Sequence, residues 1–250
     1  MNVYQEITKS KSEGRKQFAV LVDPDKIAIS DAAGLALNCN RANVDFIFVG
    51  GSLLTNGNLS LCIKELKANS NAPVVLFPGN VLQIDDQADA LLFLSLISGR
   101  NPDLLIGKQV IAAPLLKEKK IETIATGYML IDSGKMTTAV YMSNTLPIPH
   151  LKNDIAACTA LAGEMLGLKL IYMDAGSGAS NPVSEEMIAS VSKQINIPLI
   201  VGGGIKTTEK AIANCKAGAD IIVVGNAIED NFSLIGELSA AIHSLDRKST

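Results

Sequence analysis

The 250-residue chain has no tryptophan, two histidines and four cysteines, and only 4% of its residues are aromatic. The cysteines, Cys39, Cys62, Cys158 and Cys215, are far apart in the sequence and form no CxxC pair. That spacing argues against a disulfide framework and against a zinc site. We therefore expect all four to be buried free thiols in a reducing compartment.

The sequence also lacks a strong excess of charge of one sign and has no long apolar run. Charged residues make up 19% of the chain and the net charge is −3, so no basic excess points to a nucleic-acid partner. No apolar run approaches the roughly 20 residues that cross a bilayer. Residues 1–12 are polar and of mixed charge, unlike a signal peptide or an anchor. We expect a cytoplasmic protein without an integral membrane segment.

What the chain does have is eight short runs rich in Val, Ile and Leu, with helical patterns between most of them. Such runs, with little polar alternation, are typical of parallel strands buried on both faces. No linker-like composition interrupts residues 1–250, which indicates a single α/β domain. Eight parallel strands close a TIM (β/α)8 barrel, and a doubly wound open sheet is the alternative if one strand is miscounted. The expected strands are Phe18–Asp23, Phe46–Gly51, Pro73–Phe77, Ala90–Ser95, Ile124–Ile131, Lys169–Ala175, Pro198–Gly202 and Ile221–Gly225.

Two segments depart from this alternation. From Gly79 to Asp89 the chain is too short for a full helix between the third and fourth strands. From Asp132 to His150 it is rich in Thr, Asn and Pro, which predicts a long surface excursion of a functional or mobile kind.

Two glycine turns near the C-terminus are the strongest sign of function. The sequences PLIVGGGI and IIVVGNAI are apolar runs that stop at glycine and continue into helical patterns. Such a turn exposes backbone N–H groups at the positive end of a helix, where phosphate binds. In TIM barrels this site recurs after the seventh and eighth strands. The residues at these turns are Gly203, Gly204, Gly225 and Asn226.

Polar residues stand at the ends of other expected strands, including Ser95 and Tyr128. Asp23 follows an apolar run and precedes proline, so it is either a turn aspartate or a metal carboxylate. Ser52, after the next run, could add a second hard oxygen ligand. Mg²⁺ takes one or two protein oxygens of this kind and completes its shell with water and phosphate.

The segment from Tyr172 to Gly178, YMDAGSG, carries the densest set of candidates. Strand alternation places Tyr172 and Asp174 inside the barrel and Met173 toward the helices. A buried carboxylate is costly unless it is paired, solvated or used in chemistry. A structural aspartate bonded to loop amides is the alternative.

These motifs together resemble the prenylglyceryl phosphate synthases. The resemblance covers nearly the whole chain in order, through LVDPDK, FVGGS, SLISGRNP, TGYMLIDSG with SNTLPIP, YMDAGSGA, PLIVGGGI and ADIIVVGNAI. It implies a modified TIM barrel in which an irregular segment replaces the helix between strands 3 and 4. It also implies Mg²⁺-dependent transfer of a polyprenyl group, with geranylgeranyl expected, from its diphosphate to the 3-hydroxyl of sn-glycerol 1-phosphate.

The resemblance also assigns residues. Asp23 and Ser52 would hold Mg²⁺, and Asp174 with Tyr172 would be catalytic, with Asp174 as the general base. A homo-oligomer, dimer or hexamer, is implied as well. The residues implied to bind glycerol phosphate are Tyr172, Met173, Asp174, Ala175, Gly176, Ser177, Gly178, Gly203, Gly204, Gly225 and Asn226.

The chain departs from the family pattern at two positions. Many relatives have Glu where this chain has Asp174, which is one methylene shorter, so a bridging water or Tyr172 could intervene. Some relatives have Lys where this chain has Leu21. Neutralising the diphosphate would then depend on Mg²⁺, Lys26 or Arg100. Apart from this possible role of Lys26 at the diphosphate, we expect Asp25 and Lys26 to be surface charges that begin the first helix.

The prenyl chain needs an apolar groove, for which Phe77, Pro78, Leu94 and Leu96 are candidates. Ordinary core packing explains the same four residues, and periodicity does not separate the two interpretations. Two other functions stay open. One is a different phosphate-binding barrel enzyme, such as a sugar-phosphate isomerase or cyclase, which needs a second acid/base residue. The other is a phosphoprenyl-binding barrel without catalysis.

Overall fold

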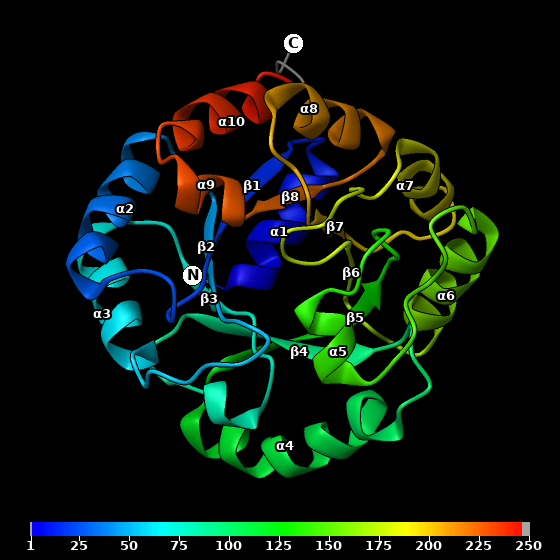
Figure 1. Ribbon diagram of the computed structural model, residues 1–250, viewed down its shortest axis with the longest axis horizontal. Helices are drawn as coiled ribbons and strands as arrows, with labels where there is room; N and C mark the ends of the chain where they lie inside the picture. The colour runs from blue at the N-terminus through cyan, green and yellow to red at the C-terminus, as the bar shows by residue number, and fades with distance from the viewer. Residues whose placement is uncertain (1, 247–250) are drawn as a thin grey trace.

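The structure, a computed structural model, describes residues 2–246. Eight parallel strands form a closed barrel in chain order (Figure 1). The eight-stranded TIM barrel is thereby confirmed, and the open sheet is excluded. The strands are β1 Gln17–Val22, β2 Phe46–Val49, β3 Val74–Leu76, β4 Ala90–Leu96, β5 Glu122–Leu130, β6 Leu170–Asp174, β7 Leu199–Gly202 and β8 Ile221–Val224.

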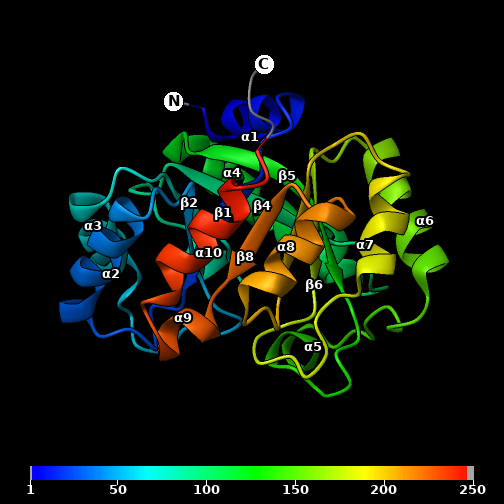
Figure 2. The ribbon, with the colours of Figure 1, turned by 90° about the horizontal axis from the view of Figure 1, so that it is seen from above.

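Helices surround the barrel, while α5 and α9 lie at the end opposite α1 (Figure 2). Between β3 and β4 the chain forms only the 3-10 turn η1, Val81–Gln83, which confirms the predicted irregular segment. The other helical elements are α1 Val3–Ser12, α2 Ile29–Arg41, α3 Leu59–Asn69, the π-helical turn η2 Asp103–Gly107, α4 Lys108–Lys119, α5 Thr138–Ser143, α6 Asn153–Met165, α7 Glu185–Ser192, α8 Thr208–Ala217, α9 Asn226–Asp230 and α10 Leu234–His243.

The strands bury both faces, which explains their continuous apolar sequences. Side chains such as Phe46, Phe48 and Ile124 fill the barrel, and the alternate residues pack against the helices. Helix α1 closes the amino-terminal end of the barrel with Val3 and Ile7.

Sequence reasoning missed α1 because its apolar residues are few and its surroundings polar. The Glu122 carboxylate accepts hydrogen bonds from the backbone N–H groups of Val3 (2.7 Å) and Tyr4 (2.9 Å). An anion at this position stabilises the positive end of the helix.

Two local expectations are wrong. Cys158 is exposed on α6, whereas the other three cysteines are buried. The first outer helix begins at Ile29, so Asp25 does not start it; its carboxylate instead accepts bonds from Thr55 and Asn56 of the next loop. The predicted excursion from Asp132 to His150 is present as a long connection between β5 and α6, and it contains the short helix α5. Within residues 2–246, no helix is both long and apolar enough to cross a bilayer.

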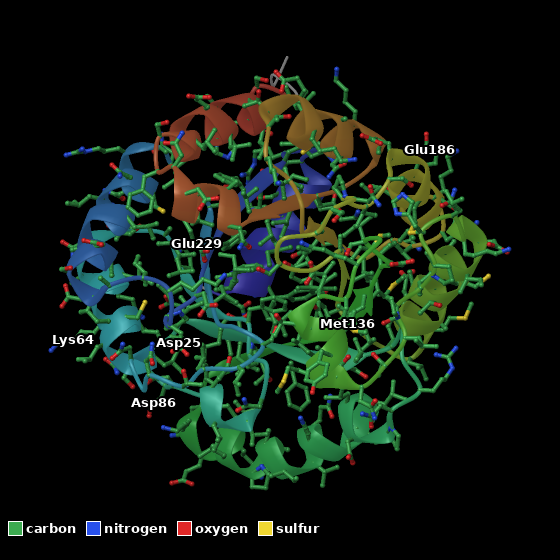
Figure 3. The ribbon with its side chains drawn as sticks, viewed as in Figure 1. Asp25, Lys64, Asp86, Met136, Glu186 and Glu229 are labelled. Atoms are coloured by element: carbon green, nitrogen blue, oxygen red, sulfur yellow. The ribbon has the colours of Figure 1, made fainter. Side chains whose placement is uncertain are left out.

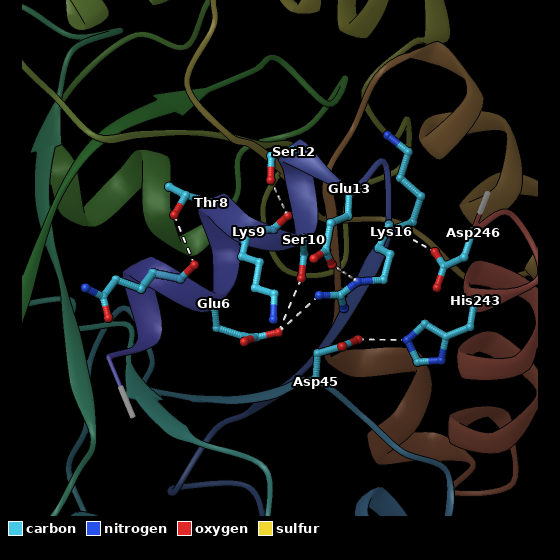
Figure 4. A network of polar contacts seen from close by, with 12 residues as sticks. Glu6, Thr8, Lys9, Ser10, Ser12, Glu13, Lys16, Asp45, His243 and Asp246 are labelled. Atoms are coloured by element: carbon cyan, nitrogen blue, oxygen red, sulfur yellow. Dashed lines mark hydrogen bonds and ion pairs between the residues drawn. The ribbon is translucent and has the colours of Figure 1, made fainter. Parts of the chain in front are cut away.

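A histidine links α10 to the amino-terminal ends of β1 and β2 (Figure 4). Nε2 of His243 lies 2.8 Å from Asp45 Oδ2, and Nδ1 lies 3.3 Å from Ser239 Oγ. Ser239 donates its own proton to the Ala42 carbonyl at 2.6 Å, so its oxygen can only accept from Nδ1. With donors at both ring nitrogens, this arrangement favours the charged imidazolium. The Asp45 hydrogen bond raises the pKa of His243 above its ordinary value.

We predict that this link makes stability depend on pH. A histidine with a raised pKa stabilises the fold fully below its unfolded pKa and loses that effect as pH rises through its folded pKa. The free energy of unfolding of wild type should exceed that of His243→Asn by about 1 kcal/mol at pH 6, and the difference should shrink by pH 8. Urea titrations across this range measure it.

The control is Asp86→Asn, which breaks the surface pair between Asp86 and Lys119. Its difference from wild type should be the same at pH 6 and pH 8, because Lys119 lowers the pKa of Asp86 further below this range. A pH-independent difference for His243→Asn would contradict the imidazolium assignment.

Candidate active site

A cavity of about 440 Å³ opens at the carboxyl ends of the strands, a size that suits a small-molecule ligand. Its walls come from the loops after β1, β2, β3, β6, β7 and β8, together with α4 and α5. Figure 3 shows Glu229 on α9 and Met136 just before α5, both inside the ring of outer helices that carries Lys64 and Glu186. Carboxylates, glycine loops and apolar side chains meet in this one cavity.

Asp174 is the most deeply placed carboxylate in the cavity wall, at 7% exposure. Tyr128 donates its hydroxyl proton to Oδ2 at 2.5 Å, and the Gly176 N–H donates to Oδ1 at 2.7 Å. Burial raises the pKa of the Asp174 carboxyl, whereas these two hydrogen bonds oppose that rise. A carboxyl group tuned in this way is suited to accept a proton from a bound ligand.

Aromatic rings form the cavity floor below Asp174. Phe77 stacks on Tyr172 with ring centroids 5.0 Å apart, and Tyr128 meets Tyr172 edge to face at 5.6 Å. Tyr128 is one of the polar residues predicted at the strand ends, but the sequence assigned it no role in binding or catalysis. The signal that finds it is strand register, because β5 pairs Tyr128 directly with Tyr172 on β6.

The predicted glycines create an open backbone surface beside Asp174. Gly176, Gly178, Gly203 and Gly204 all have φ between +67° and +89°, a region that favours glycine. A Cβ on Gly203 would lie 2.7 Å from Asp174 Oδ1 and 2.6 Å from the Gly176 nitrogen. A side chain at position 203 would therefore collide with Asp174 and with the loop after β6, so the close approach of the two loops requires glycine.

The loops after β6 and β8 are joined across this surface. The Ser177 hydroxyl donates to Asn226 Oδ1 at 2.7 Å, and Gly225 lies beside Asn226 in the cavity wall. Two other predicted residues of the same segment point elsewhere. The side chains of Met173 and Ala175 pack in the outer core and do not line the cavity.

Asp23 and Ser52 both line the opposite side of the cavity. Asp23 Oδ1 accepts from the Asp25 N–H at 3.1 Å, and Oδ2 lies 3.8 Å from Lys26 Nζ. Within residues 2–246, no three His, Cys, Asp or Glu side chains gather as a metal cage. One carboxylate and one hydroxyl are hard oxygen donors that fit Mg²⁺, provided that ligand oxygens and water complete the shell.

Of the two cationic residues predicted to neutralise a diphosphate, only one lines the cavity. Lys26 lines the cavity, where it pairs with Glu229 at 3.3 Å as well as with Asp23. Arg100 is exposed outside the lining residues and donates to the Gly99 carbonyl at 2.8 Å. Lys26, not Arg100, is the cation beside Asp23.

An apolar branch of the cavity continues toward β4 and α4. Phe77, Pro78, Leu94 and Leu96, the four predicted groove residues, all line it. It is extended by Val81 and Ile84 around η1, by Leu104 of η2 and by Ala112 and Leu116 of α4. A long apolar ligand thus has a path that starts beside both Asp174 and Asp23.

Comparison with known proteins matches residues 7–242 to the PcrB family. A geranylgeranylglyceryl phosphate synthase of Chitinophaga pinensis is 56% identical over 97% of this chain and 96% of its own length. One of Methanosphaera stadtmanae is 39% identical over 97% of this chain and its full length.

Among solved structures, the (S)-3-O-geranylgeranylglyceryl phosphate synthase of Thermoplasma acidophilum, in complex with its substrate sn-glycerol-1-phosphate, has a TM-score of 0.92 and 33% identity. The alignment covers 98% of this chain and 99% of that one. An N-acetylmannosamine-6-phosphate 2-epimerase of Clostridium perfringens, at 15% identity and a TM-score of 0.57 over 92% of this chain and 94% of its own, shares the fold alone.

We predict that Gly203→Ala lowers stability more than a matched glycine substitution does. Gly57 has φ of +67° but no atom within 4 Å of an added Cβ, so Gly57→Ala tests backbone strain alone. Strain should cost about 1 kcal/mol in both variants. The contacts with Asp174 and Gly176 should cost Gly203→Ala a further 1–3 kcal/mol or so. Urea unfolding of both proteins measures the difference, and equal losses would contradict a crowded Gly203.

Proposed function

This chain belongs to the PcrB family, and from that membership we propose that it transfers a geranylgeranyl group from its diphosphate to the 3-hydroxyl of sn-glycerol 1-phosphate. The observation that carries the proposal is the position of Asp174, between the open glycine surface and the apolar branch of the cavity. The synthases to which the chain is similar, one of them solved with sn-glycerol-1-phosphate, support the same reaction.

The acceptor is held by backbone. Its phosphate lies against the glycine loops after β6, β7 and β8, where open backbone N–H groups beside Ser177 supply donors. This places the 3-hydroxyl at the Asp174 carboxylate, which lines the cavity beside these loops. Asp174 takes the hydroxyl proton as the new carbon–oxygen bond forms and the bond from that carbon to the diphosphate oxygen breaks. Tyr172 forms the floor below the acceptor.

The donor occupies the other side of the cavity. Its prenyl chain follows Phe77, Leu94 and the residues of α4, where burial of apolar surface supplies the binding energy. Its diphosphate lies at Asp23 and Lys26. Asp23 and Ser52 would hold Mg²⁺, which when bound neutralises charge developing on the leaving diphosphate. Lys26 adds a positive charge that also neutralises the leaving diphosphate.

The other functions are less well supported. A sugar-phosphate isomerase or cyclase needs a second acid/base group near the acceptor, whereas Glu229 is paired with Lys26 on the donor side. A binding barrel without turnover remains an outcome of the assay below. A cytoplasmic location and a homo-oligomer, dimer or hexamer, stay predictions. Exposed apolar side chains on α4, including Val110 and Ile111, are compatible with association.

The test is an assay of purified protein with labelled sn-glycerol 1-phosphate and prenyl diphosphates of graded length. Wild type should form an ether product, with geranylgeranyl diphosphate as the preferred donor. Asp174→Asn should lower kcat by about 10²- to 10⁴-fold, as expected for loss of a general base. Absence of product with every donor would contradict the transferase. Full activity of Asp174→Asn would contradict only the assigned base.

Metal dependence has a separate test. Removal of divalent ions with EDTA should abolish turnover, and added Mg²⁺ should restore it. Asp23→Asn should require a Mg²⁺ concentration higher by about tenfold or more, because a neutral amide is the weaker ligand for a hard cation. Asp86→Asn is the matched control, since Asp86 pairs with Lys119 away from the cavity and its loss should leave the requirement unchanged. Activity that survives EDTA would contradict the Mg²⁺ assignment.

A further inference from the structure

The hydroxyl of Tyr128 lies 2.5 Å from Asp174 Oδ2 at the floor of the cavity. We propose that Tyr128 is a positioning residue for Asp174, fixing Oδ2 so that Oδ1 meets the acceptor hydroxyl. The inference rests on the proposed transfer reaction and adds to it a residue from β5, outside the glycine loops.

The two oxygens of Asp174 have different surroundings. Oδ2 turns down toward Tyr128, whereas Oδ1 turns toward the Gly176 N–H and the backbone of Gly203. Two hydrogen bonds from two different elements fix both torsions of a short side chain. A carboxylate held in this way presents one defined oxygen to the acceptor, which is the orientation that proton transfer needs.

Tyr128 is itself held firmly. Its strand pairs it with Tyr172, and its ring contacts Phe77 and Tyr172 edge to face, each at 5.6 Å between centroids. Burial raises the pKa of Tyr128 well above its ordinary value, and the nearby Asp174 charge raises it further. Tyr128 therefore keeps its proton near neutral pH and acts as a constant donor.

This donor matters because burial works against the ionised carboxylate. The Tyr128 and Gly176 hydrogen bonds both lower the pKa of Asp174 against the rise caused by burial. Tyr172 on β6 is the other titratable group in direct reach of Asp174. Within residues 2–246, none of the other charged cavity residues hydrogen-bonds to Asp174. Those residues are Asp23, Lys26, Lys108, Lys206 and Glu229.

The experiment compares Tyr128→Phe with Tyr141→Phe, which removes a hydroxyl from a largely exposed tyrosine on α5. Tyr128→Phe should lower kcat by about 10- to 100-fold and leave KM for glycerol 1-phosphate nearly unchanged. Losing a donor to the charged form raises the pKa of Asp174, so the acid limb of the kcat profile should move to higher pH. Tyr141→Phe should behave as wild type.

A spectroscopic measurement gives the same quantity without turnover. The infrared carbonyl band of protonated Asp174, identified by its loss in Asp174→Asn, should titrate with a midpoint at higher pH in Tyr128→Phe. Should Tyr128→Phe fold poorly, 3-fluorotyrosine at position 128 keeps the ring and strengthens donation, and the midpoint should then move to lower pH. An unmoved midpoint in both proteins overturns the proposal.

A double-mutant cycle separates positioning from an independent role. Adding Tyr128→Phe to Asp174→Asn should cost little further kcat, because Tyr128 acts through Asp174. The same fold-loss in both backgrounds overturns the proposal. Absence of product from wild type contradicts the proposed function instead, and the infrared titration then still decides whether Tyr128 controls Asp174.

Discussion

The register of β5, β6 and β7 is the constraint on which the site depends. It pairs Tyr128 with Tyr172 and Asp174 with Gly202. The Tyr128 hydroxyl, the Asp174 carboxylate and the glycine loop after β7 therefore lie at the same end of the barrel. Because side chains alternate along a strand, a slip of one residue in β6 would turn Asp174 out toward the helices and bring Met173 into the barrel. Closure of the barrel fixes this register from both sides, and the chemistry follows from it.

The two substrate anions of the proposed reaction are handled differently. The acceptor side offers backbone N–H groups on glycine loops, a fixed polar surface that needs no bulky side chain. The donor side offers Asp23, Lys26 and Glu229 linked as one charged group. Partial burial raises the pKa of Glu229, and Lys26 opposes that rise. Asp174 lies between a rigid acceptor site and a charged donor site. Among the described residues it makes hydrogen bonds but no direct ion pair.

Sequence patterns predicted the features that depend on local chemistry. Buried strands, glycine turns and the short connection after β3 each have a recognisable sequence pattern. The barrel and the positions of Asp23, Ser52 and Asp174 at its strand ends could therefore be predicted. Contacts between strands have no such pattern, which is why the sequence placed Tyr128 at a strand end but did not predict its contact with Asp174. Asp25 is a similar case, because its partners Thr55 and Asn56 belong to a different loop. Helix α1 carries only a short apolar pattern, and its role appears only against the barrel that it closes.

The absence of a full helix after β3 is compensated by one side chain. Gln83 of η1 is buried; its amide donates to the Gly51 carbonyl at 2.9 Å, and its oxygen accepts from the Gly79 N–H at 3.0 Å. This residue therefore ties the loop after β2, which carries Ser52, to the loop after β3. An unpaired buried amide is costly, so the two hydrogen bonds hold both loops in place. The barrel can thus lack a full helix beside the apolar branch, where α4 and η1 supply the lining, and still hold Ser52 in position.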